Sequence, residues 1–377
     1  MPNHLSGMDA TRITQPTSFA MLSNEPLSHH LSSATAAMPA TPTTPSTAAA
    51  VATSRLPTGV YVPMLAFFTA SDAIDVPATQ RHTARLLAAG VAGLVVHGSN
   101  GEAAHLSRAE RTVAIRAVAD AVRHAADPPS RVPIIAGCGA QSVRETVEMC
   151  AEARKSGATH VLVLPPGYYA GLLGTEGLVT FFTEVADQSP LPVLVYNYPG
   201  AAHGVDLDSD VLLRIAKHPN VVGVKLTCGN TGKLARLAAE TPKVRDGRND
   251  FFVAGGSADF LLQGMVVGGH GTIAGFANLA PRACVRIIDL FERGEFAEAR
   301  HLQAEVAKAD WLAIRYGFVG VKAAMAMFHG EEETACCAPR SPLKRLPRGG
   351  KAEEEIRAGM AAVMAIEAEL ASGKGDR

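Results

Sequence analysis

From Gly59 onward, short apolar runs alternate regularly with longer amphipathic segments. The apolar runs are rich in β-branched residues and are bounded by Gly or Pro, which is typical of strands buried on both faces. Eight such runs occur, at residues 60–67, 93–97, 132–136, 160–164, 192–196, 221–225, 251–254 and 272–274. The segments between them include amphipathic helical patterns at residues 108–124, 143–155, 178–187, 209–217 and 258–266.

Eight strands that each lead into a helix predict a TIM (β/α)8 barrel, an α/β fold. An open, doubly wound sheet is the alternative, but no GxGxxG motif follows the first predicted strand. We expect the barrel over residues 57–292 and a C-terminal helical region over residues 293–377. Within that region, helical periodicity is seen at residues 297–311, 319–328 and 351–370, and residues 330–351 are typical of a loop.

Residues 1–56 are rich in Ser, Thr, Ala and Pro, so they have too little apolar surface to offset the entropy of ordering. We therefore predict a disordered tail. A mitochondrial transit peptide is usually rich in Arg and poor in acidic residues, whereas here Arg12 and Arg55 are balanced by Asp9 and Glu25. The expected location is cytoplasmic, with a mitochondrial one as the alternative.

Composition excludes several classes of partner. A formal net charge of −1 and an aromatic fraction of 5% give no reason to expect binding to nucleic acid or to an anionic membrane. No run of about 18 apolar residues predicts a membrane span. The six cysteines form no CxxC pair, the histidines show no HxH or HExxH spacing, and no GxxxxGK[ST] loop is present. We therefore expect a small-molecule substrate, and neither a metal nor another cofactor.

Lys225 is the strongest candidate for a catalytic residue, because it follows Val221-Val222-Gly223-Val224 in a strand that should be buried. Burial disfavours a charged amine, and the neutral amine is the form that attacks a carbonyl group. The alternative is a structural lysine that reaches solvent from the strand end or pairs with a carboxylate. Sequence context alone leaves these two readings about equal.

Other polar residues follow neighbouring strands at the barrel end where catalytic groups gather. Tyr196 and Lys225 are one strand–helix unit apart, so their side chains can meet, and a phenol can relay protons. By itself, a tyrosine at such a position is more often a core residue whose hydroxyl has a hydrogen-bond partner. Ser99 and Asn100 lie in a glycine-flanked turn that could hold a carboxylate, although such turns also end strands for structural reasons.

Read together, the strand ends resemble the dihydrodipicolinate synthase and N-acetylneuraminate lyase family over roughly residues 56–328. The resemblance rests on the order and spacing of four motifs, which are Gly98-Ser99-Asn100-Gly101-Glu102, Tyr196-Asn197-Tyr198-Pro199, Gly223-Val224-Lys225 and Gly268-Gly269-His270-Gly271-Thr272-Ile273. It implies a metal-independent class I aldolase or lyase that forms a Schiff base with a pyruvate-like 2-oxo acid.

The resemblance also assigns roles at matching positions. Lys225 would be the Schiff-base lysine, and Tyr196, assisted by Ser99, the proton relay. Three further positions would bind the pyruvate part of the substrate, namely Asn100, Gly256 and Ile273. Tyr169 resembles a tyrosine that reaches a neighbouring subunit's site, and the family implies a homo-oligomer, either a dimer or a tetramer.

Departures from the family pattern reduce the range of candidate substrates. Dihydrodipicolinate synthases usually have an Arg where this chain has Ala201, and acidic residues where it has Ser257 and Ala258. The remaining motifs are most similar to those of fungal L-threo-3-deoxy-hexulosonate aldolases, which implies cleavage to pyruvate and L-glyceraldehyde. A 4-hydroxy-2-oxoglutarate aldolase, a dihydrodipicolinate synthase and a non-catalytic paralogue that binds 2-oxo acids are the alternatives.

Overall fold

Eight parallel strands close into a barrel in the order in which they occur along the chain. The structure is a computed structural model and describes residues 55–125, 132–330 and 337–373, so all but the last two residues of the predicted tail lie outside the described residues. The strands are β1 (Gly59–Pro63), β2 (Gly93–Val96), β3 (Ile134–Gly137), β4 (His160–Val163), β5 (Val193–Asn197), β6 (Val221–Leu226), β7 (Phe252–Gly255) and β8 (Gly271–Ile273). This confirms the predicted barrel.

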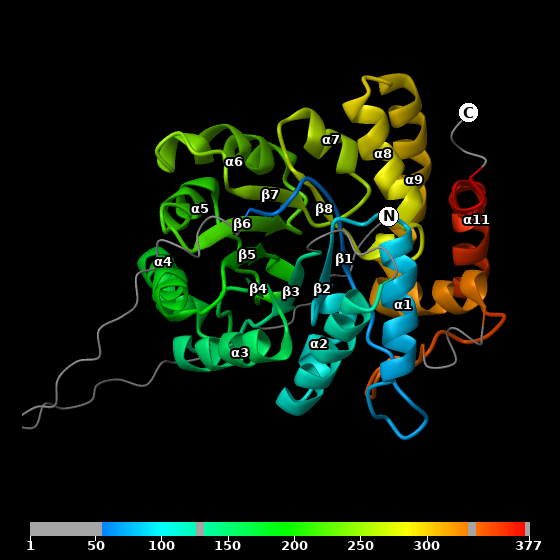
Figure 1. Cartoon of the computed structure of the whole chain (residues 1–377), viewed down its shortest axis with the longest axis horizontal. Coiled ribbons are helices and arrows are strands. Elements are labelled where there is room, and N and C mark those ends of the chain that lie inside the picture. Colours follow the sequence, from blue (N-terminus) through cyan, green and yellow to red (C-terminus); the bar gives the residue numbers. More distant parts are fainter. Residues whose placement is uncertain (1–54, 126–131, 331–336, 374–377) are drawn as a thin grey trace, which may run out of the picture. The chain divides into compact units, whose positions relative to one another are not determined.

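Helices surround these strands in Figure 1. They are α1 (Val76–Ala88), α2 (Arg108–Arg123), α3 (Val143–Ser156), α4 (Ala170–Gln188), α5 (Ser209–Ala216), α6 (Thr231–Val244), α7 (Leu261–Val266) and α8 (Pro281–Glu292). Five of them begin at a capping side chain that accepts a backbone N–H of the first turn, and these caps are Asp75, Ser107, Ser142, Asp208 and Asn230.

Side chains alternate between two buried clusters, as strands buried on both faces require. Inward-facing residues, including Tyr61, Val95, Ile135 and Phe252, fill the barrel. Outward-facing residues pack under the helices. The predicted first strand was too long, because β1 ends at Pro63 although the apolar run continues.

Two long helices follow the barrel, α9 (Phe296–His329) and α11 (Lys351–Ala371), and they pack on each other and on α8. Helix α9 bends at Gly317, whose φ of 58° is left-handed, so the two helices predicted on either side of this glycine are halves of one bent element. By length and composition alone, α9 is the one helix among the described residues that could span a membrane. Here its buried face is part of the protein core.

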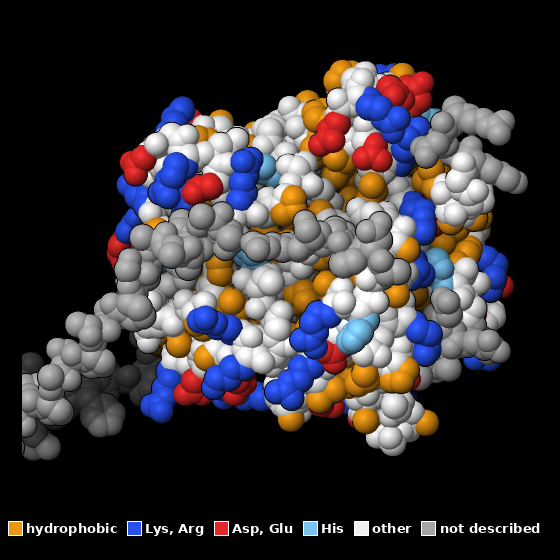
Figure 2. Space-filling model, in the orientation of Figure 1, with side chains coloured by type: hydrophobic (Ala, Val, Ile, Leu, Met, Phe, Trp, Pro, Cys, Tyr) orange, Lys and Arg blue, Asp and Glu red, His pale blue; other side chains and the backbone are white. Residues whose placement is uncertain are grey.

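The face drawn in Figure 2 carries acidic and basic side chains interspersed with one another. No large field of one sign covers the described atoms of that face.

Candidate active site

Lys225 and Tyr196 lie side by side on adjacent strands. The register pairs them directly, after an irregularity at Val193 and Leu194 in the pairing of β5 with β6. Val224 and Leu226 belong to the cluster outside the barrel, so Lys225, between them, faces inward.

Both side chains are buried, with Lys225 2% and Tyr196 4% exposed. The Lys225 Nζ lies 4.3 Å from the centroid of the Tyr196 ring. Lys225 therefore does not reach solvent, and no carboxylate pairs with it in the described part of the chain. Neither structural alternative considered for this lysine describes its surroundings.

Ser99 and Asn100 lie in a short 3₁₀ turn, η3 (Ser99–Gly101), directly after β2. The Ser99 Oγ is 3.4 Å from the Tyr196 Oη, a long hydrogen bond in which either oxygen can donate. The Asn100 amide lies on the backbone of Gly275, where an added Cβ would be 2.7 Å from its Nδ2. The turn thus brings one side chain to Tyr196 and the other to the end of β8.

Gly256 and Ile273 also lie at strand ends, since Gly256 comes directly after β7 and Ile273 is the last residue of β8. A Cβ on Gly256 would lie 2.6 Å from the Cα of Thr227, so only glycine fits at this close approach of two backbones. Ile273 is fully buried and belongs to the cluster inside the barrel. All these predicted positions therefore lie at the carboxyl ends of the strands.

Tyr169 is the exception among the predicted site residues. It precedes α4, is 62% exposed, and its ring packs on that of Tyr168, which is 70% exposed. It does not line the cavity that contains Ser99 and Tyr196. Within one chain, the structure therefore leaves Tyr169 on the surface.

A cavity of about 350 Å³ opens beside Tyr196 and Ser99, a size within the usual range for small-molecule sites. Lys225 is not on its wall, but its Nζ lies over the ring of Tyr196, which is on the wall. Ala201, from the 3₁₀ turn η5 (Pro199–Ala201), lines the cavity, as do Phe318 and Leu343 from the C-terminal region. The wall therefore combines reactive polar groups with apolar ones from outside the barrel.

Arg111 and His97 also line this cavity. The Arg111 guanidinium donates hydrogen bonds to the backbone oxygens of Gly137, at 3.1 Å, and of Ala103. Among the described residues it forms no ion pair. Burial, and to a lesser extent the charge of Arg111, lowers the pKa of His97 to about 3, so this imidazole is neutral.

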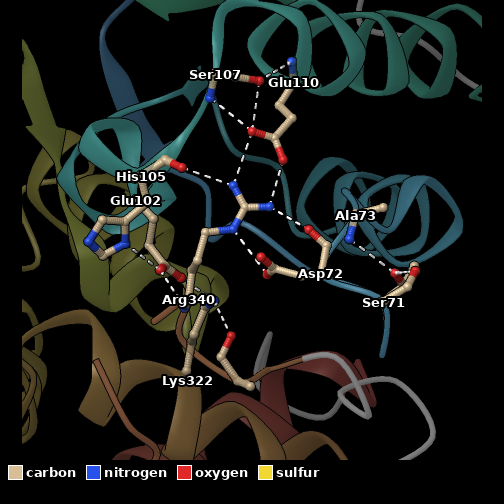
Figure 3. Close-up of polar contacts among 11 residues, drawn as sticks. Ser71, Asp72, Ala73, Glu102, His105, Ser107, Glu110, Lys322 and Arg340 are labelled. Atoms are coloured by element: carbon tan, nitrogen blue, oxygen red, sulfur yellow. Dashed lines mark hydrogen bonds and ion pairs between the residues drawn. The ribbon is translucent and has the colours of Figure 1, made fainter. Parts of the chain in front are cut away.

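Glu102 closes the Ser99 turn and forms a buried ion pair, which Figure 3 shows. Its carboxylate accepts hydrogen bonds from Lys322 Nζ, from the backbone N–H of Arg340 at 2.8 Å and from His105 Nδ1 at 3.0 Å. Both side chains of the Glu102–Lys322 pair are fully buried. Burial lowers the pKa of Lys322, and Glu102 acts in the opposite direction.

The sequence does not predict this pair, since Glu102 stands out there only as part of the turn motif. The one available signal was a lysine, Lys322, within an apolar helical segment. Nothing in the pattern around Arg340 indicated that it would reach the barrel.

Asp310 of α9 anchors the loop that follows Gly256. Its Oδ2 accepts hydrogen bonds from Ser257 Oγ at 2.7 Å and from the backbone N–H groups of Ala258 at 2.7 Å and Asp259 at 3.0 Å. Burial raises the pKa of Asp310 to about 6 against the opposing effect of these hydrogen bonds. The C-terminal region therefore supports the barrel end at β7 as well as at β2.

Within the described ranges, no group of three or more His, Cys, Asp or Glu side chains could hold a metal ion. The polar groups beside the cavity instead combine an amine, a phenol and a hydroxyl. Such a set supports amine-based covalent chemistry with proton transfer.

Comparison with known proteins gives consistent matches. Residues 56–355 match the dihydrodipicolinate synthetase family. The chain is 48% identical over 296 residues to a probable mitochondrial 4-hydroxy-2-oxoglutarate aldolase of Emericella nidulans, covering 77% of this chain and 93% of the relative. It is 44% identical over 319 residues to the L-threo-3-deoxy-hexylosonate aldolase of Hypocrea jecorina, covering 82% and 98%.

Among solved structures, a putative dihydrodipicolinate synthase family protein from Coccidioides immitis matches with a TM-score of 0.73 and 38% identity, covering 83% of this chain and 98% of that one. These similarities confirm the resemblance predicted from the motifs. They also confirm the predicted enzyme class, a carbon–carbon lyase of the aldolase type.

Proposed function

Because the chain belongs to the dihydrodipicolinate synthetase family, we propose that it is a class I aldolase that cleaves L-threo-3-deoxy-hexulosonate to pyruvate and L-glyceraldehyde. The observation that carries this proposal is the buried Lys225 beside Tyr196, with Ser99 at the Tyr196 hydroxyl. This arrangement places a nucleophile next to a group that can relay protons.

In the proposed cycle, the Lys225 amine attacks the C2 carbonyl of the substrate, and loss of water gives an iminium ion. Tyr196, supported by Ser99, takes the proton of the C4 hydroxyl. The C3–C4 bond then breaks, the aldehyde leaves, and the electron pair of that bond flows to the iminium nitrogen to form an enamine. Tyr196 returns the proton to C3 of the enamine, and addition of water to the resulting iminium ion releases pyruvate and regenerates Lys225.

Three positions would bind the carboxylate of the pyruvate part. The Asn100 amide would donate from the turn after β2, while Gly256 and Ile273 would contact the substrate through their backbones. Their location at neighbouring strand ends supports this assignment.

The choice of a sugar acid is supported by the cavity wall. Ala201 lines the cavity at the position where dihydrodipicolinate synthases usually have an Arg for a substrate carboxylate. Phe318 and Leu343 add further apolar surface, which suits an aldehyde part without charge. The similarity to the Hypocrea jecorina aldolase supports the same substrate.

A second candidate substrate is 4-hydroxy-2-oxoglutarate. It is favoured by the similarity to the Emericella nidulans protein and by Arg111, a guanidinium on the cavity wall that could attract the second carboxylate of this substrate.

Cleavage of both compounds by the purified full-length protein separates the two candidates, with pyruvate release as the readout. We expect the higher kcat/KM for L-threo-3-deoxy-hexulosonate. A higher kcat/KM for 4-hydroxy-2-oxoglutarate would replace the first substrate by the second. Release of pyruvate from neither compound would refute the proposed activity.

We further propose that Tyr169 completes the active site of a neighbouring subunit. Its exposure in the single chain, next to Tyr168 and the 87% exposed Leu172, supports a role in a homo-oligomer. Light scattering on the wild type and on Tyr169→Ala tests this idea. A monomeric wild type with full activity would refute it.

We also propose a mitochondrial location as the alternative to a cytoplasmic one. The support is the description of the Emericella nidulans relative as mitochondrial. Microscopy of a fluorescent protein fused after residue 56 separates the two locations.

A further inference from the structure

Two apolar side chains from outside the barrel line the same cavity as Ser99 and Tyr196. Phe318 comes from α9, and Leu343 comes from the segment of residues 337–350 between α9 and α11. Leu343 is 41% exposed, so it presents apolar surface that a substrate could cover. A part of the chain distant in sequence from the strand ends therefore forms one wall of the cavity.

Arg340, three residues before Leu343, fixes this segment to the barrel, as Figure 3 shows. Its guanidinium donates to Glu110 Oε1 at 2.6 Å, to Asp72 Oδ1 at 3.0 Å and to the backbone oxygen of His105 at 2.9 Å. Its backbone N–H also donates to Glu102. The Arg340 side chain is only 11% exposed, which limits the weakening of these ion pairs by solvent.

Phe318 is held by a second connection. It follows the bend at Gly317 and lies one helical turn before Lys322, on the same side of α9. Because Lys322 is fixed by the buried Glu102 carboxylate, this side of the helix is turned toward the loops at the barrel end. Both parts of the wall are thus anchored to the loop that also positions Ser99.

We propose that Leu343 and Phe318 form a specificity-determining wall for the aldehyde-derived part of the substrate, and that Arg340 is the positioning residue that holds this wall. The inference rests on the proposed function, since it concerns the same cavity. In the part of the cavity that these two side chains line, an uncharged carbon chain is favoured over a carboxylate, because burying a charge against apolar groups costs free energy.

The test uses the reverse reaction, in which pyruvate adds to glyceraldehyde, to glyoxylate or to a longer uncharged aldehyde. The ratio of kcat/KM values between these acceptors reports on the wall, and trapping of pyruvate on the enzyme by borohydride reports on the amine chemistry. We expect Leu343→Ala to lower the ratio of kcat/KM for the longer uncharged aldehyde to kcat/KM for glyoxylate by about 10-fold. Pyruvate trapping should remain unchanged. Leu346→Ala is the matched control, because Leu346 belongs to the same segment but lines a different cavity.

Arg340→Met should change the ratio in the same direction as Leu343→Ala, with Arg340→Lys retaining part of the wild-type ratio. Arg315→Met is its control, because Arg315 forms a more exposed ion pair with Glu355 on the C-terminal helices. An unchanged acceptor ratio in Leu343→Ala and Arg340→Met, with normal pyruvate trapping, overturns the inference alone. Absence of pyruvate trapping in the wild type overturns the proposed function, and the inference with it.

Discussion

The buried pair of Glu102 and Lys322 should contribute strongly to stability, which a double-mutant cycle can measure. Both side chains are fully buried, so removing Lys322 leaves a buried carboxylate. Breaking such a pair typically costs about 3–5 kcal/mol. The carboxylate keeps its bonds from the Arg340 backbone and from His105, so we expect Lys322→Met to cost about 3 kcal/mol, at the lower end of that range.

The double variant Glu102→Gln/Lys322→Met should cost less than the sum of its two single variants, because no unpaired charge remains. We expect a coupling energy of about 2–3 kcal/mol from urea denaturation followed by circular dichroism. The more exposed pair of Lys308 and Glu305 provides the matched control, with an expected coupling below about 0.5 kcal/mol. Additivity of the Glu102 and Lys322 substitutions within about 0.5 kcal/mol would contradict a stabilising interaction between these two side chains.

Three further predictions follow from the site. Tyr196→Phe should lower kcat by about 100-fold or more with an unchanged circular dichroism spectrum, whereas Tyr198→Phe should retain most activity. Gly256→Ala should cost about 1–3 kcal/mol of unfolding free energy, because its Cβ would overlap Thr227. The raised pKa of Asp310, about 6, means that its contribution to stability is complete below pH ~4 and is lost as the pH rises through about 6. In the wild type, the free energy of unfolding should therefore decrease by up to about 3 kcal/mol between pH ~4 and about 6. Urea denaturation at several pH values should show that Asp310→Asn removes this decrease.

The barrel could be predicted from the sequence because its signal is local and repeated. Each strand is a short apolar run, and each helix has its own periodicity and often its own cap. The meeting of Tyr196 with Lys225 could also be predicted, because one strand–helix unit separates residues at the same end of adjacent strands. The end of β1 was misplaced because residues 64–67 remain apolar after leaving the sheet.

The anchoring of the C-terminal region could not be predicted in the same way. Arg340 contacts Glu102 and Glu110 across more than 200 residues of chain, and such contacts have no local pattern. The walls contributed by Phe318 and Leu343 depend on that long-range packing. The sequence therefore predicts the reactive groups better than the surfaces that surround them.

Trapping with borohydride in the presence of pyruvate tests whether Lys225 forms a Schiff base. Reduction of a Schiff base would fix pyruvate to the protein, and peptide mass spectrometry would locate the modified residue. We expect a single adduct on Lys225, which Lys225→Ala abolishes while Lys233→Ala, at a lysine paired with Asp206, does not. An adduct on another lysine, or no adduct with active enzyme, would contradict it.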